Sequence, residues 1–280
     1  MNSLEFWAKS IEIKYPYFSK IGLNPIEIEY LFYHSPRLDY LLEKIKNLIN
    51  NIEDEKKRAV NILDIGPHFL TQIIRENSNA VVDQLGWRFD KVSQLKKNET
   101  HYDFDLNSTI DFNNCPKLPQ YDILIACEII EHLYTSPNYV LNFFKRIVRD
   151  DGFLVLGTPN AVSLKHRIVM LYGKNPYELI RETLDNPGHF REYTKNELIN
   201  YASKNGFELF DFNCQSYYNY IHHGIMGKMY KQLSKILPYS FRELLRSYLA
   251  FVRLQLLVRG VARTLMISER SRDSVKFLLV

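Results

Sequence analysis

The sequence predicts an α/β protein with a doubly wound, mostly parallel seven-stranded sheet, N-terminal helices and a helical C-terminal extension. Two observations favour this class. Residues 61–66 (NILDIG) and 80–86 (AVVDQLG) are apolar runs separated by a helix-length segment, and residues 121–126 and 153–158 repeat the arrangement. Such β-α-β units imply parallel strands joined by right-handed crossovers, as in Rossmann-like folds.

The chain is expected to divide into three parts. Residues 1–58 form an N-terminal helical cap, in which Leu38, Leu41, Ile45 and Leu48 recur at helical spacing. Residues 59–213 form the central domain, with an irregular insertion at 161–190 over its ligand crevice, and residues 214–280 form a basic helical extension.

Local signals support elements inside the central domain. HYDFDL (101–106) is a plausible third strand. Ser136 and Pro137 suit the N-cap and first position of a helix. Thr194 and Glu197 fit a capping box for a helix that stops before the strand-like FELFDF (207–212).

The net charge of +4 is unevenly distributed. Residues 241–280 hold eight Lys or Arg and three acidic residues, so the rest of the chain carries −1. This argues against a nucleic-acid partner. If residues 240–266 form one helix, their arginines gather on one side, which suits peripheral contact with an anionic membrane. A core-packed helix with a charged outer face is the alternative.

The cysteines and the N-terminus favour a cytoplasmic protein, with the inner membrane face as the place of any peripheral contact. Three widely spaced cysteines without a CxxC pair support neither a disulfide framework nor zinc. The first fifteen residues resemble neither a signal peptide nor a membrane span. The adjacent His222 and His223 point apart and lack a nearby acid, so we expect no metal site.

Polar residues follow two of the predicted strands where each strand ends. Glu128, Glu131 and His132 come after residues 121–126, Thr158 ends the run at 153–158, and Asn160 follows it. Because the carboxyl ends of parallel strands form the ligand crevice of an open sheet, these side chains should line one small-molecule site.

Several motifs, in order, resemble class I S-adenosylmethionine-dependent methyltransferases. They are NILDIG, an acid 17 positions after its glycine, YDILIACEIIEHL, the turn DDG, FLVLGTPN and HFREYT with the later NGFEL. The similarity covers roughly residues 60–212 and is strongest to the branch of ubiquinone-biosynthesis O-methyltransferases and surface-polysaccharide methyltransferases. It implies S-adenosylmethionine as the cofactor.

The resemblance also implies cofactor-binding residues. Asp64 and Gly66 would begin the glycine turn, and Asp83 would bind the ribose hydroxyls from the end of the second strand. Asp105 would reach the adenine amino group or cap its turn. Cys127 and Glu128 would border the transferred methyl group.

The glycine turn departs from the family pattern, because His68 and Leu70 occupy the second and third glycine positions. His68 could contact the cofactor carboxylate or belong to an adapted loop without a special role. Leu70 is expected to pack with the helix that follows.

Catalysis would need a base near the methyl group if the acceptor is a hydroxyl. His132 and His189 are the candidate catalytic residues, although His132 could simply bond neighbouring backbone. Glu131, Asn160 and Arg191 are candidates for the acceptor side, and Arg191 with Glu192 could instead be solvated.

The expected function is O-methylation of a small hydroxylated acceptor: a sugar, a surface-glycan precursor or a lipid-linked molecule. The alternative is a methyltransferase-fold protein whose altered cofactor loop makes it a binding or scaffold partner. Methylation of base amino groups is disfavoured because Ala126-Cys127-Glu128 replaces the Asn-Pro-Pro-aromatic run of such enzymes. A dehydrogenase would need a Gly-x-Gly-x-x-Gly turn, which is absent. The oligomeric state is left open.

Overall fold

A computed structural model describes residues 3–87, 91–183, 188–215, 253–260 and 275–279. Its helices are α1 (Ser3–Lys14), α2 (Pro25–Lys56), α3 (Phe69–Asn77), α4 (Pro137–Ile147), α5 (Leu164–Leu171) and α6 (Lys195–Lys204). Its strands are β1 (Asn61–Ile65), β2 (Val81–Gly86), β3 (His101–Asp103), β4 (Tyr121–Cys127), β5 (Val148–Pro159), β6 (Phe207–Gln215), β7 (Arg253–Gly260) and β8 (Val275–Leu279). Short 3-10 turns include residues Leu106–Ile110 and Ile130–His132.

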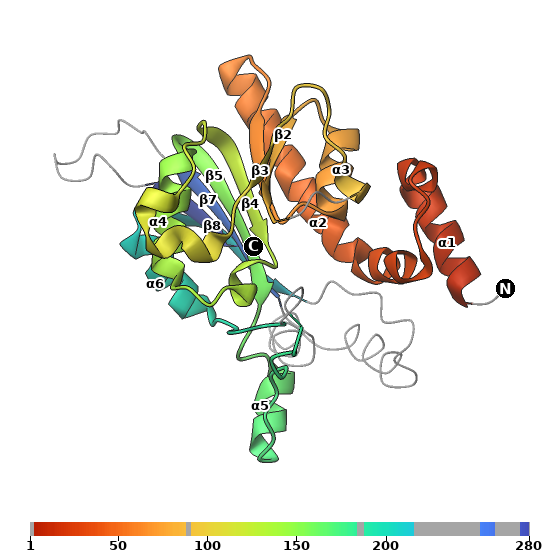
Figure 1. Cartoon of the computed structure of the whole chain (residues 1–280), viewed down its shortest axis with the longest axis vertical. Coiled ribbons are helices and arrows are strands. Elements are labelled where there is room, and N and C mark those ends of the chain that lie inside the picture. The colour runs from red at the N-terminus through yellow and green to blue at the C-terminus, as the bar shows by residue number, and fades with distance from the viewer. Residues whose placement is uncertain (1–2, 88–90, 184–187, 216–252, 261–274, 280) are drawn as a thin grey trace, which may run out of the picture.

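All described strands join one sheet in the order β3-β2-β1-β4-β5-β7-β6-β8 (Figure 1). The first five strands are parallel, and β7 runs antiparallel to both β5 and β6. The parallel, doubly wound part is confirmed, but the predicted count of seven strands is wrong, because β8 pairs beside β6. Within the sheet, the chain begins at β1 and winds outward to β3. It then crosses back to β4, so the winding direction changes between β1 and β4.

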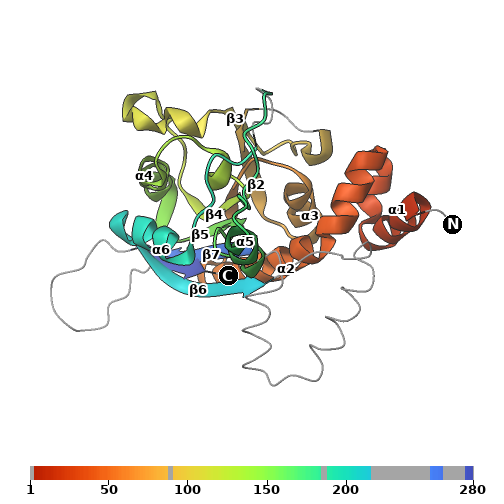
Figure 2. The same ribbon diagram turned by 90° about the horizontal axis from the view of Figure 1, so that it is seen from below.

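Consecutive residues of the parallel strands enter opposite cores, which explains their continuous apolar runs. Ile62, Val82 and Ile123 pack with α1, α2 and α3, whereas Leu63 and Leu124 pack with α4 and α6. Figure 2 shows these two helical groups on opposite faces of the sheet.

The long helix α2 brings N-terminal residues to the carboxyl edge of the sheet. Asn24 and Glu27 form a capping box at its start, and its predicted apolar stripe is buried. Pro36 lies inside the helix, where it supplies no backbone donor. The residues on either side of this proline, Tyr30 and Arg37, line the cavity described below.

The helical prediction for the C-terminal extension is wrong where the structure describes it. Residues 253–260 form β7, with backbone pairing to β5 and β6, and residues 275–279 form β8. RLQLLVRG alternates polar and apolar residues only over its first four positions, a short period of two that the helical interpretation overlooked. Residues 240–252 and 261–266, and His222 with His223, lie outside the described residues, so the membrane contact stays a prediction. None of the described helices combines the length and apolarity needed to span a bilayer.

One buried carboxylate joins the amino-terminal edge of the sheet to the end of α2. Asp122 accepts hydrogen bonds from both Arg58 Nη atoms at 2.6 and 2.7 Å and from the Asn61 backbone at 3.0 Å. Lys56 and Arg149 add two further cations at 3.4 and 3.3 Å. Burial raises the pKa of Asp122, but these donors outweigh burial, so the pKa is lowered from its usual value.

We predict that Asp122→Asn lowers the free energy of unfolding at neutral pH by about 2 kcal/mol, because three cations lose their carboxylate. A carboxyl with a depressed folded-state pKa stabilises above its unfolded pKa and loses this contribution as pH falls through the folded pKa. Urea unfolding should therefore show the deficit at pH 7 and little of it below that folded pKa. Asp151→Asn is the control, because Asp151 is half exposed and should cost less than about 0.5 kcal/mol. Equal losses in both variants would contradict the prediction.

Candidate active site

A cavity of about 570 Å³ lies at the carboxyl ends of β1 and β4. Its walls come from α2, from the loop after β1, from the end of β2 and from the segment after β4. The lining includes Tyr30, Arg37, Asp64, Gly66, His68, Leu70, Trp87, Asp105, Cys127, Glu128 and His132. The sheet therefore brings most of the predicted cofactor-binding residues together at the expected edge.

The turn after β1 depends on Gly66. Its φ of 68° is a left-handed conformation that favours glycine, and its backbone N–H bonds Leu85 O at 2.9 Å. A Cβ atom at this position would lie 2.4 Å from Ile129 Cδ1. The glycine thus permits a close approach between the loops that follow β1 and β4.

The two residues at the altered glycine positions pack against the N-terminal part of the protein. Leu70 belongs to the core shared by α2 and α3, as predicted. The His68 ring lies 5.4 Å from the Tyr30 ring and 4.2 Å from the Phe69 ring. Both residues still line the cavity, so the altered loop keeps an open space beside Gly66.

Asp64 is buried beneath this loop. Thr71 Oγ1 donates a 2.6 Å hydrogen bond to its carboxylate. Burial raises the pKa of Asp64 to about 6, although the Thr71 bond and the charge of Arg75 oppose the rise. The Asp64 carboxyl group therefore gains its proton at a higher pH than an ordinary aspartate does.

Asp83 is not at the end of its strand, contrary to the sequence prediction. β2 continues for three residues to Gly86, and it is Gly86 and Trp87 that line the cavity. The Asp83 carboxylate accepts 2.8 Å hydrogen bonds from Tyr121 Oη and from the Thr100 backbone. Its role as a ribose ligand thus stays a prediction, and Asp83 is not among the residues that line the cavity.

Asp105 lines the cavity and also caps the turn that follows it. Its Oδ1 accepts hydrogen bonds from the backbone and side-chain nitrogens of Asn107 at 2.8 and 3.0 Å. Both uses suggested by the sequence are thus compatible with its position.

Arg37 is the site residue that the sequence analysis missed. Its side chain is nearly buried, and Nη1 lies 3.2 Å from Glu128 Oε1. Glu128 has a φ of 61°, and its backbone N–H bonds Gly157 O at 2.7 Å. A detectable signal existed: Arg37 lies four residues before Leu41 and eight before Ile45, so a charge falls on the buried face of α2.

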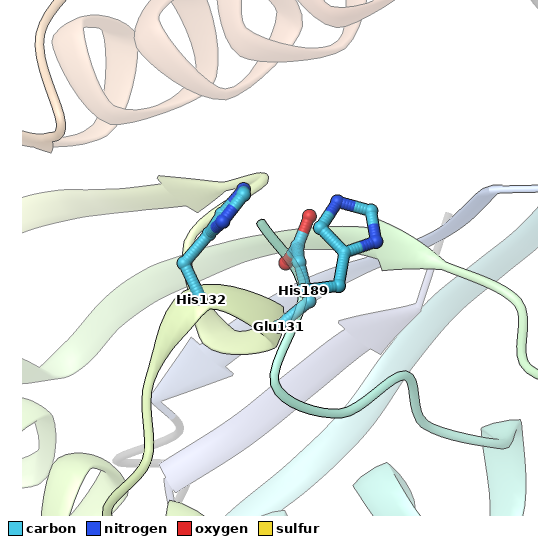
Figure 3. A group of neighbouring side chains, drawn as sticks. All are labelled: Glu131, His132 and His189. Atoms are coloured by element: carbon cyan, nitrogen blue, oxygen red, sulfur yellow. The ribbon is translucent and has the colours of Figure 1, made fainter. Parts of the chain in front are cut away.

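The two predicted catalytic histidines meet beside Glu131 (Figure 3). Their rings lie 4.8 Å apart in an edge-to-face arrangement. The His132 Nδ1 atom lies 2.8 Å from Gly188 O, and because a carbonyl only accepts, Nδ1 must donate and Nε2 carries the lone pair of the neutral ring. Burial lowers the pKa of His132, against the effect of this bond.

Glu131 anchors the segment that carries His189. Its backbone oxygen accepts hydrogen bonds from Phe190 and Arg191 nitrogens, and its buried carboxyl accepts one from Thr158 Oγ1 at 3.0 Å. Burial raises the pKa of Glu131 to about 8. Glu131, His132 and His189 each offer a ligand atom within 4.8 Å of the others, so this cluster has room for a cation that the sequence did not predict.

The remaining predicted acceptor residues lie farther from the cavity lining. Asn160 forms a backbone bridge with Tyr193, and its Oδ1 accepts from the Val162 backbone at 3.0 Å. Arg191 is more than half exposed and forms an ion pair with Glu197. Neither residue lines the cavity, and their acceptor roles stay predictions.

Comparison with known proteins places this geometry in a family. The profile of a family described as "Methyltransferase domain" matches residues 37–211, more than half of the chain. The chain therefore belongs to the methyltransferase family, in the class I S-adenosylmethionine-dependent group, and S-adenosylmethionine is the cofactor of that class.

Individual relatives are more distant. Ubiquinone biosynthesis O-methyltransferase of Rickettsia bellii (strain OSU 85-389) is 32% identical over 129 residues, covering 44% of this chain and 50% of the relative. The Rickettsia felis protein of the same name is 30% identical over 129 residues, covering 44% and 49%. The chain thus spans about half the length of the curated relatives that it matches. A solved structure of a putative sarcosine dimethylglycine methyltransferase from Galdieria sulphuraria is 14% identical, covers 86% of this chain and 92% of its own, and has a TM-score of 0.49.

The geometry at Gly66 yields a stability prediction. Gly66→Ala should lower the free energy of unfolding by about 1 kcal/mol through left-handed strain, plus a further cost from the Ile129 contact. Gly173→Ala is a matched control, because its φ is 70° and a Cβ there meets nothing within 4 Å. Thermal or urea unfolding should rank Gly66→Ala as the less stable variant, and Ile129→Ala should remove part of the difference. A Gly173→Ala loss as large as that of Gly66→Ala would show that the contact is unimportant.

Proposed function

We propose that the protein transfers a methyl group from S-adenosylmethionine to a hydroxyl oxygen of a small acceptor. The observation that carries the proposal is the position of His132 on the wall of the cavity, with Nδ1 bound to Gly188 O and Nε2 left as the proton acceptor. Family membership supports the reaction class, and the names of the relatives favour an oxygen acceptor.

The cavity residues fit the chemical groups of the cofactor. Arg37 supplies a buried guanidinium whose Nε has no hydrogen-bond partner among the described residues, which suits the carboxylate of the methionine portion. Gly66 allows close backbone approach, with His68 beside it. Trp87 and Asp105 border the opposite side, where the adenosine portion would bind. Cys127 and Glu128 follow β4 and would border the methyl group.

Bound S-adenosylmethionine supplies an electrophilic methyl group on a positively charged sulfur. Transfer to oxygen is an in-line displacement, so most of the protein's contribution is to bring the acceptor into line and exclude water. His132 Nε2 would take the hydroxyl proton as the new carbon–oxygen bond forms. Glu131 and His189 lie beside this ring.

The acceptor is proposed to be a sugar, a surface-glycan precursor or a lipid-linked molecule, and the protein is proposed to act in the cytoplasm without a nucleic-acid partner. The near-neutral charge outside residues 241–280 supports the absence of a nucleic-acid partner. Peripheral membrane contact stays a proposal for the flanking residues 240–252 and 261–266 alone, because residues 253–260 form β7 between β5 and β6 and so cannot belong to one amphipathic helix.

A scaffold role is the second candidate function. It is favoured by His68 and Leu70 at glycine positions and by the absence of Asp83 from the cavity lining. Calorimetric titration with S-adenosylmethionine separates the two functions. Binding supports the enzyme, and no detectable binding at millimolar S-adenosylmethionine would exclude the enzyme.

Arg37→Met should weaken S-adenosylmethionine binding by about 10- to 100-fold, because a charge-assisted hydrogen bond to the carboxylate is lost. Calorimetry would measure the dissociation constants of both proteins. Arg181→Met is the control, since Arg181 is exposed, pairs with Glu178 and is not among the residues that line the cavity. Unchanged affinity in Arg37→Met would remove Arg37 from the proposed cofactor site.

His132→Asn should lower kcat by about 100-fold or more, the usual contribution of a general base, with cofactor affinity nearly unchanged. Transfer of labelled methyl from S-adenosylmethionine can be screened with a simple catechol and with nucleotide sugars. His101→Asn is the control, because His101 lies on β3 and contacts Gln84. Full activity of His132→Asn on an accepted substrate would exclude this histidine as the base.

A further inference from the structure

Glu192 lies between two histidines that come from different segments of the chain. Its Oε1 is 3.1 Å from Nδ1 of His189, and its Oε2 is 3.6 Å from Nδ1 of His166. The carboxylate is largely buried, with 9% of the side chain exposed. Among the described residues Oε2 has no hydrogen-bond partner. It is close enough to His166 for an ion pair, but too far for a hydrogen bond. Burying a carboxylate costs free energy unless nearby hydrogen-bond donors or cations compensate its charge.

The His166 side of this arrangement ties α5 to the same carboxylate. His166 Nδ1 is also 3.2 Å from Ala161 O, and Tyr177 Oη donates to that oxygen at 3.0 Å. The His166 and Tyr177 rings meet at 5.3 Å. Figure 1 shows α5 projecting from the body of the protein.

On its other side Glu192 contacts His189, whose ring lies beside the ring of His132. A carboxylate only accepts hydrogen bonds, so His189 Nδ1 must carry the proton and Nε2 must carry the lone pair of the neutral ring. The ring is then held with one edge on Glu192 and lies 4.8 Å from the ring of His132. Figure 3 shows His189 beside Glu131 and His132, on a different segment of the chain.

We propose that Glu192 is a positioning residue for methyl transfer. It fixes the tautomer and orientation of His189 next to His132, and through His166 it joins α5 to the same unit. The inference rests on the proposed function, because it assigns Glu192 a role behind the histidines of that site. Glu192 does not line the cavity, so it acts through His189.

A double-mutant cycle tests this dependence. Glu192→Ala should lower kcat by about tenfold while leaving the dissociation constant of S-adenosylmethionine within about twofold. Glu192→Gln keeps an oxygen that can accept from Nδ1 and should retain more activity. In a His189→Ala background, adding Glu192→Ala should change kcat by less than about twofold. Independent, multiplicative losses would overturn the proposal, because they indicate a general structural role.

A second readout does not require an acceptor. Nitrogen-15 NMR of the histidine rings should show the Nδ1–H tautomer of His189 in the wild type and in Glu192→Gln, and a shift toward Nε2–H in Glu192→Ala. Glu182→Ala is the control, because Glu182 is exposed and lies on the insertion at 161–190, which also carries His189. An unchanged His189 tautomer in Glu192→Ala would overturn the proposal. If the wild type transferred no methyl group, the proposed function would fail, and the tautomer would still decide the role of Glu192.

Discussion

The parallel pairing of β1 with β4 is the constraint on which the rest of the structure depends. Chain connections leave these neighbours in opposite directions, so a crevice opens at their carboxyl ends. The two loops that follow must then pass each other closely, and Gly66 makes this possible beside Ile129. The cavity and the histidine cluster are both consequences of this edge.

The site at this edge of the sheet is completed by segments that are distant in sequence. Arg37 arrives from α2, whose apolar stripe packs on one face of the sheet. His189 arrives from the segment before α6, which is held by backbone bonds to Glu131 O. Because each segment is fixed by a different kind of contact, apolar burial for one and backbone hydrogen bonds for the other, the two walls of the site are positioned independently.

The sequence predicts the parts of this site that follow directly from strand ends. Glu128, His132 and Gly66 lie at the edge expected from apolar runs alone. Asp83 was expected at the end of its strand, but β2 extends three residues further to Gly86, and the ribose-ligand role of Asp83 stays a prediction. Arg37 was missed because its contact with Glu128 joins positions 91 residues apart, and β7 was missed because a run rich in Leu and Arg satisfies both helical and strand periods over short lengths.

The two side chains that replace glycines in the turn after β1 pack against the N-terminal cap. Leu70 fills the core between α2 and α3, and His68 packs against Tyr30, so both replacements gain contacts with neighbouring elements. A loop made only of glycines would lack these contacts and would depend more on the cofactor for its shape. The same side chains that depart from the family pattern therefore pre-organise the loop through α2, the helix that also delivers Arg37. This coupling favours an adapted cofactor site over a degenerate one, since Arg37, although paired with Glu128, keeps a buried Nε beside the cavity that has no hydrogen-bond partner among the described residues.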